Sequence, residues 1–524
     1  MLNISSTVCF AIILAVVADS ARILGVFPMT SISHQYVFRA LTLELAKRGH
    51  ELVVITPDPA FPKTKAPYKY TEIDVSFTYE KLKEFQNDMT FYKRGVIIEA
   101  ETVLRFDVYK CMLELYMDAL HSESVEKLIQ DKSQRFDLIL LERLLNYHLI
   151  FTEIFKAPAI LVSSFHGVPE SYEIMGAVAR HPIFYPTIMR ENFGNLSLIE
   201  KIQETKFEYE FMKTLQKVEK YENEQLKAKF GPNTPTVFEL KNNIDFLFIN
   251  SNPIFCNNRP VPPNVAFVGP LHLQPLKELP QDLKSYLDFS KTGVIYVSLG
   301  TNVKPSNMDK ELLNAFLSAF EALPYDILFK FDEDNTKKIP KNVKIQKWFP
   351  QRDLLAHPNV KLFVTQGGVQ STDEAIDAGV PLVTIPMLGE QYYNAHKHVE
   401  LGIGIRLDAL TLDAKTLLKG IEEVLNNRSY RENIRKLKEI MDDQLQTPME
   451  RAVWWTEYVI RHKGARHLRS LAANISWAEY LMADVLFTLA AIAFSTLLAI
   501  ALLIKFMLST LFRISVSKNK IKQS

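Results

Sequence analysis

The stretch Phe363-Val-Thr-Gln-Gly-Gly-Val-Gln-Ser-Thr-Asp-Glu374 contains three patterns that decide the fold of its half of the chain. It completes an apolar run over residues 360–364, which is typical of a buried strand. A glycine-rich turn follows, and then a helix is predicted over about 371–378, with Gln370 and Ser371 expected to cap it. Strand, tight turn and helix in this order indicate one unit of an open α/β sheet.

The same stretch predicts an anion site. Free backbone N–H groups and the positive end of the helix dipole point at one spot. Glu374 lies one helical turn beyond Gln370 and Ser371, so the three side chains are expected near one face. The pattern therefore favours a phosphate joined to a group that bears hydroxyls.

Composition limits the class of protein. The chain has 524 residues, 47% of them hydrophobic, and a formal net charge of +1. This length supports two or three globular domains plus a membrane segment, and the absence of basic excess argues against nucleic acid as a partner. Cys111 and Cys256 remain once the N-terminal segment is removed, and they are either two buried thiols or one disulfide. No Cys/His cluster has zinc spacing.

Both ends of the chain carry targeting features. Residues 1–20 are typical of a secretory signal peptide, and 484–506 of a single transmembrane helix. A basic tail, 507–524, follows. This order predicts a type I protein of the endoplasmic reticulum membrane with luminal domains. The sequons at Asn195, Asn427 and Asn474 suit a luminal protein.

A β-loop-α-β unit opens the first half, with strands over 22–27 and 51–56 and a helix over 35–48. His34 ends the loop after the first strand. Another buried strand, 136–141, is followed by Glu142. Since carboxyl ends of parallel strands share one edge, His34 and Glu142 are expected together where open α/β sheets bind ligands. Further strands are predicted over 159–163 and 246–250, the latter as the last of this half, and 197–230 as a helical insertion or a solvated helical pair.

The pattern restarts after a proline-rich linker, 259–285. Strands are predicted over 294–299 and 327–331, with the Gly300 turn and a helix over 308–323 between them. Two Rossmann-like domains, 21–258 and 286–445, would then face a cleft. A charged amphipathic helix is predicted over 431–445. A second one, over 447–462, is expected to pack back across both domains, within a C-terminal segment assigned to 446–483.

Trp348 ends another predicted strand, just before a turn imposed by proline. An aromatic ring there presents a flat face to a base, or else fills the core.

The ordered set Trp348-Phe-Pro-Gln351, His357-Pro358, residues 363–374, Pro381, Pro386, Glu390-Gln391 and Asn394 resembles the donor-binding signature of the UDP-glycosyltransferases. The resemblance extends over essentially the whole chain. The segment Gly464-Ala-Arg-His-Leu-Arg469, the membrane span and the basic tail are similar to membrane-bound animal members, and Gln366 resembles the insect ones.

This resemblance implies an α/β GT-B fold with an N-terminal acceptor domain, a C-terminal donor domain and neither metal nor cofactor. Trp348 and the Phe349 backbone would bind uracil, and Glu374 and Gln351 the nucleoside. Glu390 and Gln391 would bind the sugar. The diphosphate would be held by Gly300, Thr301, Gln366, Gly368, Gln370 and Ser371.

His34 matches the family's general base, and Glu142 lies where the family has a supporting aspartate. A histidine can take a proton from a hydroxyl acceptor near neutral pH, while a carboxylate fixes its tautomer. The expected reaction is inverting transfer of a hexose, with UDP-glucose as the expected donor, to a small lipophilic acceptor. Three positions depart from the family pattern: Glu142 and Glu390, where aspartate is usual, and Gln366, where histidine is common.

Other functions remain open at this point. One is a sterol or ceramide transferase of the same fold, and another is an inactive member that binds a lipophile or scaffolds partners. A nicotinamide dehydrogenase is disfavoured, because neither Gly367-Gly368 nor Gly402-Ile-Gly404 completes a Gly-x-Gly-x-x-Gly fingerprint. The acceptor and a homo-oligomeric state are left open.

Overall fold

The structure, a computed structural model, describes residues 20–62, 64–86, 92–168, 170–333 and 339–521. Nearly all of the expected signal peptide and the last three residues of the tail lie outside this part. The chain forms two compact units, residues 1–470 and 471–524.

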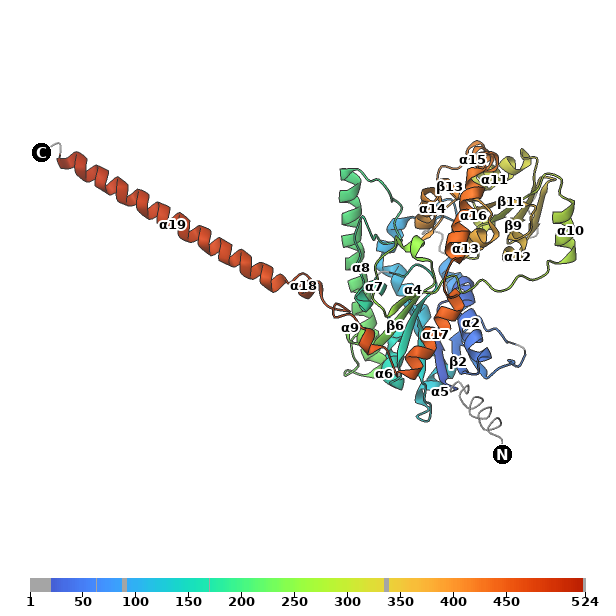
Figure 1. Ribbon diagram of the computed structural model, residues 1–524, viewed down its shortest axis with the longest axis horizontal. Coiled ribbons are helices and arrows are strands. Elements are labelled where there is room, and N and C mark those ends of the chain that lie inside the picture. The colour runs from blue at the N-terminus through green and yellow to red at the C-terminus, as the bar shows by residue number, and fades with distance from the viewer. Residues whose placement is uncertain (1–19, 63, 87–91, 169, 334–338, 522–524) are drawn as a thin grey trace, which may run out of the picture. The chain divides into compact units, whose positions relative to one another are not determined.

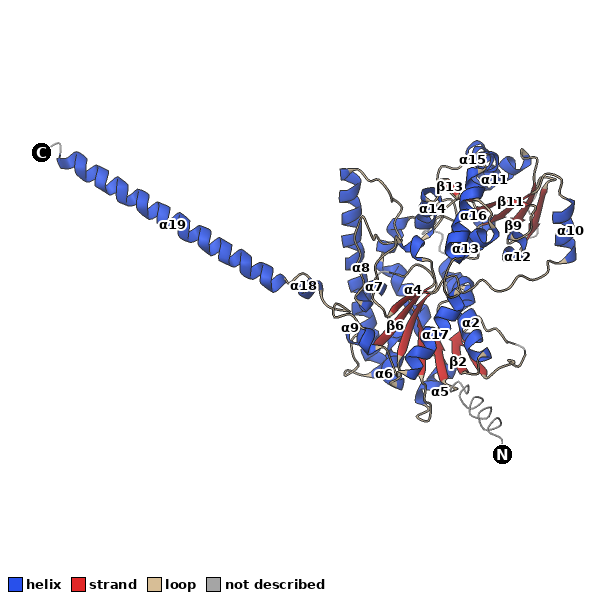
Figure 2. Cartoon of the chain, viewed as in Figure 1, coloured by secondary structure: helices blue, strands red, loops and turns tan. Residues whose placement is uncertain are grey.

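A seven-stranded parallel sheet forms the core of the first half, in the order β3-β2-β1-β4-β5-β6-β7 (Figure 2). The chain reverses direction across the sheet between β1 and β4, and Val26 pairs with Ile55 on one side and Leu141 on the other. The loop after β1 and the end of β4 therefore meet at one edge, as predicted. The strands are β1 (Arg22–Val26), β2 (Glu51–Thr56), β3 (Tyr70–Asp74), β4 (Leu138–Glu142), β5 (Ala159–Ser163), β6 (Ile244–Ile249) and β7 (Val265–Phe267).

β7 corrects one prediction, because β6 is not the last strand of this half. Val265 pairs in parallel with Leu247, inside the segment expected to be a linker. A three-residue strand among prolines gives no usable alternation in the sequence.

Two helices of this half also differ from expectation. α2 (Ile32–Lys47) begins three residues early, so His34 lies in its first turn and not in the loop before it. α8 (Leu198–Phe230) is one continuous helix of 33 residues and not a pair (Figure 1). A capping box of Ser197 and Glu200 starts it, and no Gly or Pro interrupts it.

The remaining helices of this half are short or support the sheet. They are α3 (Thr78–Gln86), α4 (Phe106–Leu120), α5 (Glu123–Gln130), α6 (Ile150–Phe155), α7 (Ser171–Met175) and α9 (Val237–Leu240), with 3₁₀ turns η2 (Ala100–Leu104), η3 (Tyr147–Leu149), η4 (Lys241–Asn243) and η5 (Pro253–Cys256).

The second half repeats this plan with a six-stranded parallel sheet in the order β10-β9-β8-β11-β12-β13. Its strands are β8 (Val294–Ser298), β9 (Asp326–Lys330), β10 (Val343–Gln346), β11 (Val360–Thr365), β12 (Leu382–Thr384) and β13 (Gly404–Arg406). Its helices and turns are α10 (Gln281–Phe289), η6 (Pro305–Asn307), α11 (Lys310–Glu321), α12 (Gln351–Leu355), α13 (Val369–Ala378), α14 (Gln391–Glu400), α15 (Ala414–Asn426) and α16 (Ser429–Asp442).

The chain then returns to the first half. α16 contributes Ile434 to the core of the second half, whereas α17 (Pro448–Arg461) contributes Val453 to the core of the first. η7 (Arg466–Leu468) follows α17. Cys111 and Cys256 are both free thiols, which decides against a disulfide between them.

The second unit contains α18 (Trp477–Tyr480) and α19 (Ala483–Ile521). Within the described residues, one helical segment, Ala483–Ser515, is long and apolar enough to cross a membrane. It contains the predicted span.

Candidate active site

A cavity of about 280 Å³ lies between the two halves of the first unit. Its first-half wall includes Ser33, His34, Tyr36 and Phe165. Every residue predicted to bind the nucleotide or the sugar lines the opposite wall: Gly300, Thr301, Trp348, Phe349, Gln351, Gln366, Gly368, Gln370, Ser371, Glu374, Glu390 and Gln391.

His34 and Glu142 form a hydrogen-bonded pair on the first-half side. Nδ1 of His34 lies 3.0 Å from Oε1 of Glu142, whose side chain is only 1% exposed. The Met29 N–H donates to the other carboxylate oxygen at 3.0 Å. When the proton is on Nδ1, the lone pair of the neutral imidazole is on Nε2, which can then accept a proton. This is the tautomer that a general base requires. The extra methylene of Glu142 therefore still allows contact with His34.

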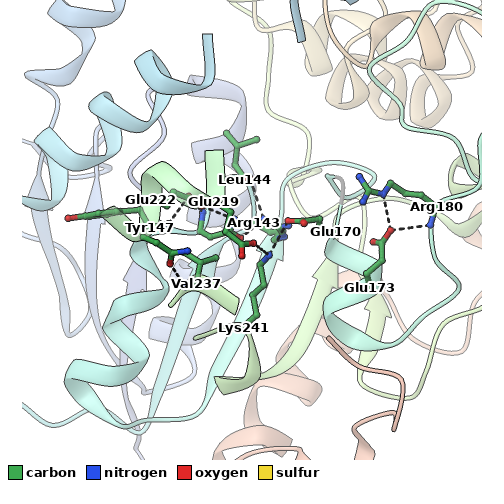
Figure 3. A network of polar contacts seen from close by, with 12 residues as sticks. Arg143, Leu144, Tyr147, Glu170, Glu173, Arg180, Glu219, Glu222, Val237 and Lys241 are labelled. Carbon is green, nitrogen blue, oxygen red and sulfur yellow. Dashed lines mark hydrogen bonds and ion pairs between the residues drawn. The ribbon is translucent and has the colours of Figure 1, made fainter. Parts of the chain in front are cut away.

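Buried polar groups hold the loop behind Glu142 (Figure 3). The carboxylate of Glu222, on α8, accepts the backbone N–H groups of Asn146 at 2.7 Å and Tyr147 at 3.1 Å. The guanidinium of Arg143 donates to the side chain of Asn146, and His148 bonds the carbonyl of Glu142. Burial raises the pKa of Glu222 to about 7. α8 thus supports the loop that follows β4.

α13 begins at the second-half wall of the cavity. The prediction that Gln370 and Ser371 cap this helix is wrong. Gly368, in an extended conformation, occupies the N-cap position, and no side chain caps the helix. Gln370 and Ser371 lie inside the first turn, where their side chains have other partners: Gln370 donates to the Ser164 carbonyl at 3.2 Å, and Ser371 accepts from Gln351 at 2.9 Å. The first backbone N–H groups of α13 remain without intrahelical acceptors.

A chain of hydrogen bonds orients Gln351 and Glu374. The Tyr296 hydroxyl donates to Oε1 of Gln351 at 3.2 Å, and Nε2 of Gln351 donates to Glu374 at 2.7 Å. Burial raises the pKa of the Glu374 carboxyl to about 7. The hydrogen bond from Gln351 orients this carboxyl at the wall of the cavity, where its oxygens can accept hydrogen bonds from hydroxyl groups.

Trp348 is 51% exposed at the cavity, which excludes a role as core filler. The Lys330 ammonium lies 4.6 Å from the centre of its ring and donates to the Gly300 carbonyl at 2.8 Å. Burial lowers the pKa of Lys330 to about 8. Lys330 was not predicted to line the site, because a lysine at the end of a strand is ordinarily a solvated residue.

Gly300 and Gln366 lie against each other. Gly300 has φ +80°, and a Cβ there would lie 2.0 Å from Nε2 of Gln366. A side chain at position 300 would therefore be strained and would clash. Within the described residues, Oε1 of Gln366 is buried without a hydrogen-bond partner.

Glu390 and Gln391 lie where the predicted sugar subsite meets the first half. Burial raises the pKa of Glu390, while the charge of the nearby His34 acts in the opposite direction. Oε1 of Gln391 accepts the backbone N–H groups of Met387 at 3.0 Å and Leu388 at 3.1 Å. The amide nitrogen of Gln391 is therefore the side-chain atom available to hydrogen-bond a ligand.

Asn195 and Asn427 do not line this cavity, and both are exposed. Asn474, in the second unit, is half-buried. Their glycosylation stays a prediction. In the part of the chain that the structure describes, no group of three or more His, Cys, Asp or Glu side chains is arranged to hold a metal ion.

The sequence model of the UDP-glucoronosyl and UDP-glucosyl transferase family matches residues 22–520. The chain belongs to this family. This UDP-glycosyltransferase is 40% identical, over 494 residues, to the ecdysteroid UDP-glucosyltransferase of Spodoptera littoralis nuclear polyhedrosis virus, covering 91% of this chain and 96% of the viral one. It is 30% identical to UDP-glucosyltransferase 2 of Dactylopius coccus, over 90% of each chain. The predicted family and its insect-like character are confirmed.

Solved structures confirm the fold of the enzyme. LpCGTa in complex with UDP matches with a TM-score of 0.54 and 16% identity, over 85% of this chain and 99% of that one. The calicheamicin glycosyltransferase CalG4 matches with a TM-score of 0.51 and 20% identity, over 84% and 99%. Two parallel doubly wound sheets facing a cavity are the predicted GT-B arrangement.

Proposed function

We propose that this enzyme transfers glucose from UDP-glucose to a hydroxyl group of a small lipophilic acceptor. The observation that carries the proposal is the His34–Glu142 pair, at 3.0 Å, facing the nucleotide wall of one cavity. Glucose is favoured because the viral relative and the Dactylopius coccus relative are both named as glucosyltransferases. The viral name also makes an ecdysteroid the first acceptor to test.

In the proposed reaction, Nε2 of His34 takes the proton of the acceptor hydroxyl as its oxygen attacks the anomeric carbon of glucose. The bond from that carbon to the β-phosphate oxygen breaks, and its electron pair leaves with UDP. Glu142 stabilises the imidazolium that forms. A single displacement of this kind inverts the anomeric configuration.

The second-half wall would hold the donor. Trp348 would stack on uracil, with Phe349 at its edge, and Glu374, oriented by Gln351, would accept the ribose hydroxyls. The start of α13, with Gln366, Gln370, Ser371 and the Gly300-Thr301 turn, would stabilise the charge that develops on the diphosphate. Glu390 and Gln391 would bind the hexose. No step in this scheme uses a metal ion.

The cellular setting follows from the ends of the chain. The helix α19 supports anchorage in a membrane. The luminal orientation in the endoplasmic reticulum is a proposal that the sequence motivates, whereas a homo-oligomeric state stays open.

The test is a donor and acceptor panel on the full-length protein in detergent micelles. UDP-glucose, UDP-galactose and UDP-glucuronate are each paired with an ecdysteroid, a simple phenol and a ceramide, and UDP release and the mass of the product are measured. The proposal expects UDP-glucose to be used best and a hydroxyl of the steroid or phenol to be glucosylated. Glucosylation of ceramide alone would identify a lipid transferase, and UDP binding without any transfer would favour the inactive alternative.

A further inference from the structure

A turn of the first half is built into the core of the second. We call residues 92–99, between α3 and η2, the docking turn. Lys93 and Ile97 pair across it, and Val96 and Ile97 are buried among the core residues of the second half. Ile97 is fully buried. This part of the acceptor half therefore belongs, by its packing, to the donor half.

Arg94 fastens the turn with four side-chain hydrogen bonds, all to residues of the second half. Nε donates to the Asp309 carboxylate at 3.1 Å. Nη1 donates to three backbone carbonyls in the loop between β13 and α15: Ala409 at 3.0 Å, Leu410 at 3.3 Å and Leu412 at 3.1 Å. Hydrogen bonds from a charged donor are among the stronger contacts in proteins.

The backbone of the turn is strained at the same residue. Arg94 has φ +48° and Gly95 has φ +80°. Glycine tolerates such values, whereas arginine rarely adopts them. A Cβ at Gly95 would lie 1.9 Å from the Asn307 carbonyl oxygen, so the turn is pressed against the second half. Backbone strain of this kind persists where surrounding contacts enforce it. Here, the hydrogen bonds of the Arg94 side chain are those contacts.

The docking turn touches the segment that carries the predicted sugar residues. The Ile98 N–H donates to the Met387 carbonyl at 2.7 Å. From the other side, Oε1 of Gln391 accepts the N–H of Met387. The backbone that leads to Glu390 is thus held between the docking turn and α14.

We propose that Arg94 is a positioning residue for the donor sugar: it fixes the docking turn, which holds the Met387–Gln391 segment so that Glu390 faces His34 across the cleft. The inference rests on the proposed function, because it assumes that this segment binds the hexose of the donor. It predicts that loss of Arg94 weakens binding of the sugar and leaves binding of the nucleotide unchanged.

The test compares binding of UDP-glucose and UDP, by calorimetry, in full-length wild type and Arg94→Asn. Asparagine followed by glycine is common in turns where both residues have positive φ, as residues 94 and 95 do here. The change therefore removes the guanidinium and preserves the turn. We expect UDP-glucose to bind about tenfold more weakly and UDP within about twofold of wild type, because the lost hydrogen bonds anchor the docking turn, whose backbone contacts the segment that carries Glu390. The kcat for glucose transfer should fall as well.

Arg135→Asn is the matched control, since the exposed Arg135 also donates to backbone carbonyls, but only within its own loop. It should change neither affinity. Should Arg94→Asn fail to fold, Asp309→Asn takes its place: the amide oxygen still caps α11 through the Leu312 N–H, and the charge opposite Arg94 is gone. We then expect the same selective loss, of about threefold, from weakening a single charged bond.

Unchanged UDP-glucose affinity in Arg94→Asn would overturn the inference, and so would an equal loss of UDP and UDP-glucose in the folded variant. A wild-type protein that binds UDP but neither binds nor transfers glucose would instead overturn the proposed function, and this inference with it.

Discussion

In the proposed reaction, the charge on Glu142 supports His34 as the general base. Glu142→Gln keeps the shape and removes the negative charge that holds the Nδ1 proton of His34. We expect kcat to fall by about a hundredfold or more, because an amide can select the wrong imidazole tautomer and does not stabilise the imidazolium.

Glu142→Asp is the informative companion in steady-state kinetics at saturating UDP-glucose and acceptor. Glu142→Asp keeps the negative charge but shortens the side chain by one methylene. This variant should retain more activity than Glu142→Gln. Equal activity of Glu142→Gln and wild type would contradict the assigned role.

Lys330 makes a second prediction, about pH. Its ammonium lies at Trp348 and Gly300, and among the described residues no carboxylate lies within ion-pair distance of it. Burial lowers its pKa to about 8, so the positive charge is present at pH 7 and lost by pH 9. UDP is an anion, and its affinity for the wild type should therefore fall as pH rises through 8.

Calorimetry on Lys330→Met checks this prediction. UDP should bind about tenfold more weakly at pH 7, and its affinity should change little between pH 7 and 9, because the charge on the wall is gone. The apo variant should melt no lower than wild type, since a desolvated ammonium disfavours folding. Lys344→Met, which removes a similar cation from the Tyr286 ring outside the cavity, is the control. A wild-type affinity that is flat across this range would refute the proposal.

At the scale of elements, α8 is expected to stabilise the loop behind Glu142. Glu222→Leu would leave the N–H groups of Asn146 and Tyr147 without their buried acceptor. We expect a loss of about 3 kcal/mol in the free energy of unfolding, from about 1–3 kcal/mol for each unsatisfied group.

Chemical denaturation of wild type and Glu222→Leu measures that loss. Glu224→Leu, on the exposed side of α8, serves as the control and should be close to neutral. A Glu222→Leu protein as stable as wild type would show that α8 does not hold the loop.

The elements also show what could be predicted from the sequence. Buried strands and their following turns are local patterns, so the edge that carries His34 and Glu142 and the strand–turn–helix order at residues 360–378 could be predicted before the structure. The docking turn could not, because Arg94 finds its partners more than 200 residues away in the sequence. Lys330 was missed because its burial beside Trp348 and Gly300, and not its position on a strand, makes it unusual. Helix starts at Ile32 and Val369 depended on backbone conformation and not on capping side chains.

At the scale of the whole molecule, the two compact units predict a separable anchor. A chain ending at Ser470 retains all of the first unit and lacks α19. We expect it to leave the membrane fraction in carbonate extraction and to bind UDP with wild-type affinity. A truncated protein that stays with the membrane would reveal a second membrane contact.

The central claim is a division of labour across the cleft: the second half holds the donor, and His34 of the first half activates the acceptor. The most direct test is UDP-glucose binding measured beside glucose transfer in His34→Ala, with His396→Ala, from a histidine–carboxylate pair outside the cavity, as the control. We predict that His34→Ala binds UDP-glucose within about twofold of wild type and loses about a thousandfold in transfer rate. Undiminished transfer, or loss of binding and transfer together, would contradict the claim.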